Sequence, residues 1–185
     1  MVKVVIVNGM PESGKTTFQY RCIDKLKKLG YNTAILSSID WVKEIALQCG
    51  WNGVKDDKNR KFLSDLKKLL TDWDDAVLKH LINDINYYHY QTDNTVIFID
   101  IREPEEIKRA EKLFNASSVI VRRPQVECNH YSNSSDMNVF NHSYDYTLWN
   151  DRGIDELDSE IDDFIRHMIV ENSNHVYNIK EDCDE

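Results

Sequence analysis

The chain has 185 residues, of which 41% are hydrophobic and 30% are charged, and its formal net charge is −9. This length and mixture fit one soluble domain with a core of its own, and the negative charge argues against a general nucleic-acid or membrane surface, which needs a basic face. No apolar run approaches the roughly 20 residues of a membrane span, and the chain opens without a signal-peptide pattern. The four cysteines are scattered without a CxxC pair, as is typical of reduced thiols. We therefore expect a cytoplasmic protein that binds neither nucleic acid nor a membrane, and whose sequence is compatible with a homodimer.

The first element is the segment Val2–Val7, an apolar, β-branched run typical of a strand buried on both faces of a parallel sheet. The segment Gly9–Thr16 follows, and its letters GMPESGKT match G-x-x-x-x-G-K-[ST], the phosphate-binding P-loop, with a helical pattern directly after it. A polyphosphate needs many hydrogen-bond donors and no side chains in the way, which the glycines and the helix N-terminus provide. We therefore predict that Lys15 reaches the β- and γ-phosphates of a nucleotide and that the Thr16 hydroxyl ligates Mg²⁺.

The helix after this loop is predicted from an apolar stripe at helical spacing, and it is expected to end at Gly30, a residue type favoured just beyond a helix C-terminus. The stripe consists of Phe18, Cys22, Ile23, Leu26 and Leu29. The second strand is expected at Asn32–Leu36, which completes the β–P-loop–α–β opening of an α/β fold.

Residues 37–93 are predicted to form an all-helical insert between the second strand and the next apolar run. After possible capping residues at Ser37–Asp40, a short helix is expected to end at Gly50, and Trp51–Asn59 is expected to be a loop. Two apolar stripes follow, separated by a break around residues 72–75. The first stripe is Phe62, Leu66, Leu69 and Trp73, and the second is Val77, Leu81, Ile82 and Ile85.

The third strand is predicted at Val96–Asp100, an apolar run that ends in an acid and so matches the Walker B pattern. In P-loop proteins this strand lies beside the first, so we expect the Asp100 carboxylate to reach the metal site near Thr16. A helix over Glu103–Phe114 and a strand over Ser118–Val121 are predicted next.

Residues 123–143 are predicted to be a lid or a mobile loop, because the segment Gln125–Ser143 is rich in Asn, Ser and His and has little periodicity. The last strand is expected within Tyr144–Trp149, and an amphipathic helix is expected from Ile154 to Met168. Together these elements predict a single α/β domain over residues 1–185, with about five parallel strands and helices on both faces of the sheet.

Arginine residues are informative here because they neutralise the charge of a phosphoryl group in transfer. Arg102 lies two residues past Asp100, at the carboxyl end of a strand, which is where ligands of open α/β sheets bind. The alternative for Arg102 is a salt bridge to Glu105 or Glu106 in the following helix.

The other candidate cations have weaker signals. Lys43 and Arg60 flank the first segment of the insert and are either acceptor ligands or solvated helix charges. Arg122 and Arg123 close a strand just before the long loop, and we expect at least one of them to contact the adenine ring or the phosphates of ATP.

Several segments occur in the order that one kinase family has them: Gly9–Thr16, Ile39–Ala46, Gly50–Gly53 with the charged run to Leu63, Ile99–Ile107, Arg122–Pro124 and Trp149–Leu157. On these segments, which cover most of the chain, the sequence resembles the phage-type deoxynucleoside monophosphate kinases of the P-loop nucleoside monophosphate kinase group. The P-loop is specific to the superfamily, whereas the Asp-x-Arg-x-x-x-Glu run and the Asn-Asp-x-Gly turn indicate the family.

The resemblance implies transfer of the γ-phosphate of ATP to a deoxynucleoside 5′-monophosphate with Mg²⁺, on a three-layer P-loop kinase fold with strand order 2-3-1-4-5. It implies Lys15 and Arg102 as catalytic residues, and Thr16 and Asp100 as metal ligands. The helical insert of residues 37–93 would bind the acceptor, and the acceptor site would contain Asp40, Lys43, Arg60 and Arg102. The ATP site would contain Gly9, Pro11, Glu12, Ser13, Gly14, Lys15, Thr16, Thr17, Arg122 and Arg123.

The lid is where the sequence departs from the family, since many of these kinases carry a run of arginines there and residues 125–143 contain none. Either Arg122, Arg123 and Arg152 supply the positive charge, or the lid works poorly. Two rival functions therefore stay open: a P-loop kinase for another small acceptor, and a sensor or scaffold that binds ATP without transferring phosphate.

Overall fold

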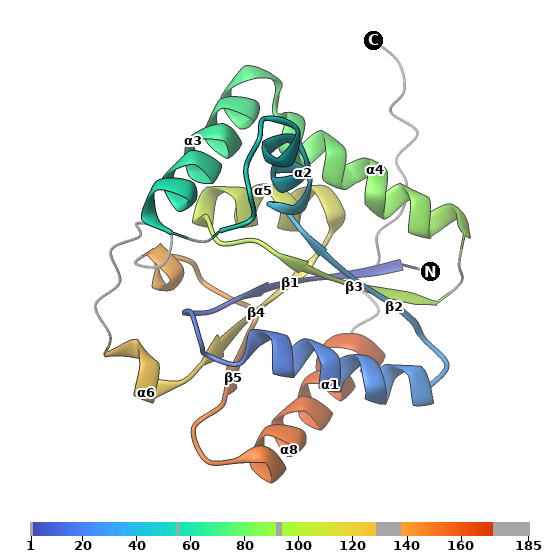
Figure 1. Cartoon of the computed structure of the whole chain (residues 1–185). Coiled ribbons are helices and arrows are strands. Elements are labelled where there is room, and N and C mark those ends of the chain that lie inside the picture. Colours follow the sequence, from blue (N-terminus) through green and yellow to red (C-terminus); the bar gives the residue numbers. More distant parts are fainter. Residues whose placement is uncertain (1, 55, 92–93, 129–137, 172–185) are drawn as a thin grey trace.

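A computed structural model describes residues 2–54, 56–91, 94–128 and 138–171, and it contains a five-stranded sheet in the order β2-β3-β1-β4-β5 (Figure 1). The strands are β1 (Val2–Asn8), β2 (Asn32–Ser37), β3 (Thr95–Asp100), β4 (Ser117–Arg122) and β5 (Tyr146–Trp149). All the pairings between them are parallel. Both the fold class and the expected strand order are thereby confirmed.

The central strand β1 shows why the sheet needs helices on both faces. Val5 and Val7 are buried in one apolar cluster, whereas Val4 and Ile6 are buried in another. Alternate residues of a strand point to opposite faces, so an unbroken apolar run requires cover on both sides.

The first face is covered by α1 (Lys15–Lys28), by α8 (Ile154–Phe164) and by the π-helical turn η2 (Ile165–Glu171) that continues it (Figure 1). The side chains that fill this layer include Phe18, Cys22, Leu26, Ile161 and Phe164, all buried. Phe18 contacts Phe164 edge to face, with ring centroids 5.1 Å apart. The P-loop helix is thereby packed firmly against the sheet, which fixes the direction of its N-terminus.

The opposite face carries α2 (Asp40–Gln48), α3 (Asp57–Asp74), α4 (Ala76–Gln91) and α5 (Pro104–Phe114) (Figure 1). Of these, α4 and α5 supply buried side chains to the second cluster, among them Leu81, Ile85, Ile107 and Phe114. The predicted break before α4 is present, because Asp75 adopts the left-handed conformation with φ +52°.

Helix ends follow the sequence signals closely. Beyond α1, Gly30 has φ +84°, the Gly30 N–H donates to Lys27 and the Tyr31 N–H donates to Leu26. This is the Schellman arrangement, which satisfies the last carbonyl groups of a helix. Gly50, at φ +91°, ends α2 in the same way.

Two expectations need correction. The stripe Phe62, Leu66, Leu69 and Trp73 of α3 has the right period, but no residue of α3 is fully buried and Trp73 is 74% exposed. The half-buried face is instead made by Leu63, Leu66 and Leu70, because α3 packs on α2 and α4 rather than on the sheet.

The segment 123–143 is also more ordered at its ends than a plain loop. It begins with α6 (Pro124–Glu127) and ends with the short 3₁₀ helix η1 (Asn138–Phe140), whose Val139 is fully buried. The middle of the predicted lid, residues 129–137, lies outside the described residues, as does the acidic end of the chain, residues 172–185.

Candidate active site

The P-loop joins β1 to α1 at the carboxyl edge of the sheet, and its conformation depends on two glycines. A Cβ on Gly9, at φ +149°, would lie 2.5 Å from the Val121 carbonyl oxygen. A Cβ on Gly14, at φ +99°, would lie 2.3 Å from Nδ2 of Asn150. The backbone of β4 therefore excludes a side chain at Gly9, whereas at Gly14 it is the positive φ that favours glycine, because Asn150 could move aside.

The end of the loop and the start of α1 can offer hydrogen-bond donors to an anion. Gly14 caps α1 without any side-chain hydrogen bond to the first turn. Within the described part of the chain, the buried hydroxyl of Ser13 has no hydrogen-bond partner either. Unsatisfied N–H groups and the positive end of the helix dipole together attract phosphate, so the residues present fit the phosphates of ATP.

Next to these donors is a cavity of about 340 Å³. It is lined by residues of the loop, of α1 and of the ends of β4 and β5: Glu12, Gly14, Lys15, Thr16, Thr17, Arg123 and Asn150. The Lys15 Nζ donates to the carbonyl oxygens of Gly9 at 2.6 Å and Met10 at 2.8 Å, folding the side chain back over the loop. The ammonium group is thus held at the rim of the cavity that is proposed to take the phosphates.

Asp100 ends β3 beside the loop, since the register pairs it with Val7 of β1. Its Oδ1 accepts a 2.7 Å hydrogen bond from Nε2 of Gln19, a buried residue one turn beyond Lys15 on α1. Burial raises the pKa of the Asp100 carboxyl; the Gln19 amide and the charges of Lys15 and Arg102 oppose this rise. A carboxylate and the Thr16 hydroxyl are hard oxygen donors, which fit Mg²⁺ with further ligands from phosphate and water.

This environment predicts a stability gain on removing the charge. Because burial raises the pKa of Asp100 above its unfolded value, the ionised form destabilises the folded protein at neutral pH, and protonation relieves this as the pH falls. We expect Asp100→Asn, unfolded by urea with EDTA present, to have a higher free energy of unfolding than wild type at pH 7.5. The difference should vanish below about pH 4.

The matched control is Asp72→Asn, which removes an exposed carboxylate paired with Lys68 on α3. It should change the free energy of unfolding by less than about 0.5 kcal/mol. If Asp100→Asn is the less stable protein at pH 7.5, the carboxylate stabilises the fold and this account of its environment is wrong.

The adjacent arginines at the end of β4 have different surroundings. Arg123 lines the cavity, and its Nη1 donates to the Glu12 carbonyl oxygen at 3.3 Å. Arg122 instead makes a two-point contact with the Glu127 carboxylate, at 3.0 and 2.5 Å. Its guanidinium lies over the ring of Phe140 and over the ring of Trp149, 4.9 and 4.8 Å from their centroids. Of the pair, Arg123 is therefore the one placed for an ATP contact.

The predicted acceptor residues surround the same end of β3. Arg102 is exposed two residues beyond Asp100, and the charges of Arg102 and Asp40 both act on the Asp100 carboxyl. Lys43 pairs with Asp40 at 2.8 Å within α2, and Arg60 is exposed in the first turn of α3. The structure thus brings Arg102 and Asp40 close to Asp100.

The carboxylates named as alternative partners of Arg102 have other cations nearby. Glu105 pairs with Lys108 at 2.8 Å, and Glu106 pairs with Lys67 of α3 at 2.6 Å. Lys67 also donates to the Ser38 hydroxyl at 2.8 Å. This half-buried contact fastens α3, which has no buried residue of its own, to the end of β2 and to α5.

Three residues that the motifs did not single out contribute to the site. Gln19 orients Asp100, Asn150 donates from Nδ2 to the Ser13 carbonyl oxygen at 2.9 Å, and Lys67 holds α3. A signal existed for Gln19, because position 19 lies on the buried arc of α1 between Phe18 and Cys22 and a polar residue there is unusual. Asn150 directly follows a strand end at the ligand-binding edge, which is a weaker signal.

In the part of the chain that the structure describes, no helix is both long enough and apolar enough to cross a membrane. Within the same residues, no three His, Cys, Asp or Glu side chains gather as ligands for one metal ion.

No family model matches the sequence, and no curated protein matches it either. Solved structures do resemble the fold. A protein from Chloroflexus aurantiacus, described as a provisional kinase, aligns with a TM-score of 0.50 and 12% identity over 89% of this chain and 94% of its own. The shikimate kinase of Aquifex aeolicus aligns with a TM-score of 0.49 and 17% identity, over 88% of this chain and 96% of its own. The Mycobacterium tuberculosis APS kinase bound to AMPPNP and APS aligns with a TM-score of 0.47 and 19% identity, over 89% of this chain and 97% of its own. At such identities the likeness shows the fold alone.

Proposed function

We propose that this chain is a kinase that transfers the γ-phosphoryl group of ATP to a deoxynucleoside 5′-monophosphate, forming the diphosphate and ADP. The observation that carries the proposal is the position of Asp100. This carboxylate accepts a hydrogen bond from Gln19 of the P-loop helix, and the charges of Lys15, Arg102 and Asp40 all act on it. Two anionic ligands could therefore meet at one metal-binding carboxylate.

On the donor side, the loop amides and the N-terminus of α1 would bind the β- and γ-phosphates, and Arg123 would extend the site toward the base. On nucleotide binding, the Lys15 ammonium would exchange the carbonyl oxygens of Gly9 and Met10 for phosphate oxygens, which carry more negative charge. Thr16 and Asp100 would hold Mg²⁺, which neutralises charge on the phosphates when bound.

On the acceptor side, Arg102 would bind the phosphate of the monophosphate and hold it in line with the γ-phosphate. Lys43 and Arg60, on helices α2 and α3, would complete the positive surface, and Asp40 would bind a polar group of the acceptor. No side-chain base is required, because the attacking phosphate oxygen is already an anion. Catalysis then consists of positioning and charge neutralisation.

One observation favours the runner-up, a P-loop kinase that phosphorylates a hydroxyl group of another small acceptor. The acceptor side carries several carboxylates. Burial raises the pKa of Asp84 on α4, the charge of His80 opposes this rise, and the charges of Glu44 and Asp40 add to it. Lys43 is already paired with Asp40. This reduces the positive charge available to a phosphate and suits an acceptor with hydroxyl groups.

The test is an assay of ADP release with ATP and Mg²⁺ against the common deoxynucleoside and ribonucleoside monophosphates and a set of hydroxylated, non-nucleotide acceptors. The proposal predicts that one or more deoxynucleoside monophosphates raise ADP release above the acceptor-free rate. Stimulation by hydroxylated acceptors alone would establish the runner-up. Tight ATP binding with no acceptor-dependent release would contradict both and leave a nucleotide sensor.

A further inference from the structure

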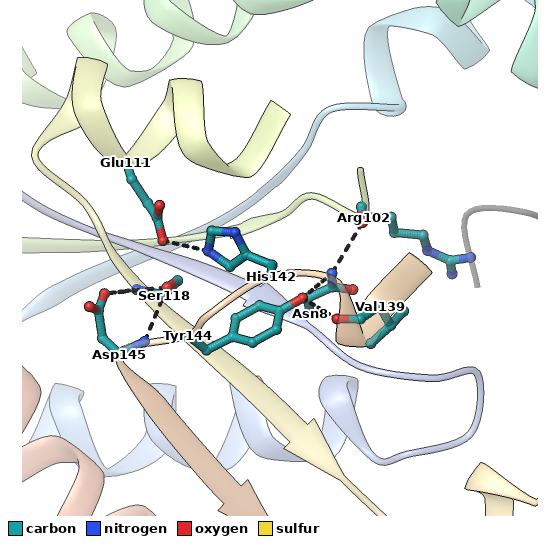
Figure 2. Close-up of polar contacts among 8 residues, drawn as sticks. All are labelled: Asn8, Arg102, Glu111, Ser118, Val139, His142, Tyr144 and Asp145. Carbon is teal, nitrogen blue, oxygen red and sulfur yellow. Dashed lines mark hydrogen bonds and ion pairs between the residues drawn. The ribbon is translucent and has the colours of Figure 1, made fainter. Parts of the chain in front are cut away.

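Asn8, the last residue of β1, connects the P-loop on the donor side of the candidate site to the Arg102 segment on the acceptor side. It is fully buried. Its Oδ1 accepts a hydrogen bond from the Gly9 N–H at 2.8 Å, at the entrance of the P-loop. Its Nδ2 donates to the carbonyl oxygen of Arg102 at 3.2 Å and to the hydroxyl of Tyr144 at 2.7 Å (Figure 2). One amide thereby joins the donor loop, the Arg102 segment and the segment before β5.

The chemistry of these partners fixes the orientation of the amide. The Gly9 N–H can only donate and the Arg102 carbonyl can only accept, so Oδ1 of Asn8 must face Gly9 and Nδ2 must face Arg102. The remaining hydrogen of the amide goes to Tyr144. Both amide hydrogens are therefore used. Loss of any of these hydrogen bonds would leave a buried polar atom unpaired, and an unpaired buried atom destabilises the fold far more than an unpaired exposed one.

Tyr144 is itself fixed in place. Its hydroxyl donates to the Val139 carbonyl oxygen at 2.7 Å, and its ring packs against the buried cluster that contains Met10 of the P-loop and Val139. Burial raises the pKa of Tyr144 to about 12. The hydroxyl therefore keeps its proton at neutral pH and can donate to Val139 while it accepts from Asn8.

The residues on either side of Tyr144 anchor it to the sheet and to α5 (Figure 2). The buried ring of His142 contacts the Glu111 carboxylate of α5, with Nε2 2.9 Å from Oε1. On the other side, the Asp145 carboxylate accepts from the Ser118 N–H of β4 at 2.8 Å. Tyr144 is thus a rigid support for Asn8 rather than part of a loose loop.

We propose that Asn8 and Tyr144 are positioning residues that hold the entrance of the P-loop in a fixed relation to the Arg102 segment, so that donor and acceptor phosphates meet in line. The carbonyl of Arg102 is held by this link, whereas its side chain points away from Asn8 (Figure 2). Neither Asn8 nor Tyr144 lines the P-loop cavity. Loss of the link should therefore weaken alignment in the transition state more than the binding of either substrate, because small misplacements cost rate steeply.

The proposal rests on the proposed kinase function, and Tyr144→Phe tests it by removing one hydroxyl. We expect kcat to fall about tenfold, with the KM of ATP and of the acceptor each within about twofold of wild type. Tyr146→Phe is the matched control, because Tyr146 is half-buried against Phe164 and its hydroxyl has no partner among the described residues. The control should keep kcat within about twofold.

A second variant and a second measurement separate positioning from folding. Asn8→Asp keeps the acceptor for Gly9 but loses both donated hydrogen bonds, so it should lower kcat at least as much as Tyr144→Phe. The double variant should be no slower than the worse single variant, because both changes break one link. Additive losses, or a fall in ATP affinity in place of kcat, would overturn the proposal.

Hydrogen exchange gives a result that does not depend on catalysis. In the ligand-free protein, the amide of Gly9 should exchange faster in Tyr144→Phe than in Tyr146→Phe, since its acceptor Asn8 is less well held. If the wild type transfers no phosphate, the kinase proposal fails. The exchange comparison would still show whether Tyr144 holds Asn8 and the entrance of the P-loop in place. Equal exchange in the two variants would overturn the positioning role.

Discussion

Replacing Lys15 with alanine is expected to lower kcat of phosphoryl transfer by about 10³-fold, the scale on which preorganised charge in a closed site acts. The reason is the position of the ammonium group, which lies on the rim of the P-loop cavity and already binds two loop carbonyl oxygens. Removing it also takes two hydrogen bonds from the loop, at a cost of about 1 kcal/mol each in stability. The fold should therefore persist, as circular dichroism and thermal unfolding can verify.

Lys28→Ala is the control for this change. It removes the same charge from the same helix, and Lys28 is exposed near the C-terminus of that helix. Its kcat should match wild type within about twofold. Should Lys15→Ala retain acceptor-dependent transfer at a rate comparable to that of Lys28→Ala, the P-loop would not be the catalytic centre.

The second large effect concerns Arg102. Arg102→Ala should raise the KM of the acceptor, or lower kcat, by about 10- to 100-fold, the loss expected for a charged hydrogen bond to a phosphate. The KM of ATP should change by less than about twofold, since the donor contacts come from the P-loop. Initial rates measured with each substrate varied in turn give both constants.

Arg166→Ala provides the comparison, because Arg166 is mostly exposed after α8 and forms a local ion pair with Asp163. It should leave both KM values unchanged. An equal loss in the constants for ATP and for the acceptor in Arg102→Ala would place Arg102 on the donor side and remove the main acceptor ligand from the proposal.

The fold was predictable because its signals are local. Apolar runs such as Val96–Asp100 specify strands buried on both faces, and Gly30 and Gly50 specify where helices stop. The inward face of α3 was not predictable in the same way. Leu63 and Leu70 directly follow Phe62 and Leu69 in the sequence, so both pairs have helical spacing. Only the packing of α3 against its neighbouring helices decides which pair is covered.

The residues of the candidate site also differ in how far the sequence predicts them. Lys15, Thr16 and Asp100 occur in motifs whose spacing predicts their roles. Arg122 and Arg123 are adjacent at the end of β4, and the sequence does not tell which of them faces the cavity, because that depends on the pairing of Arg122 with the later residue Glu127.

The supporting residues were the least predictable. The amide of Asn8 meets the hydroxyl of Tyr144, 136 positions away along the chain, and Asn150 reaches the carbonyl of Ser13 across 137 positions. Such contacts arise only once the parallel strands have been ordered. Their residue types are common and carry no local pattern, so only the assembled structure reveals them.

The most direct test of the central claim is to follow the γ-phosphoryl group itself. ATP labelled in its γ-phosphate, Mg²⁺ and each deoxynucleoside monophosphate would be mixed with excess enzyme, and the products of a single turnover separated. The proposed function predicts that the label appears in a deoxynucleoside diphosphate, and that it does not appear with Lys15→Ala on the same timescale. Label that appears only as free phosphate, or stays in ATP with every monophosphate, would contradict the claim that this site transfers phosphate between two nucleotides.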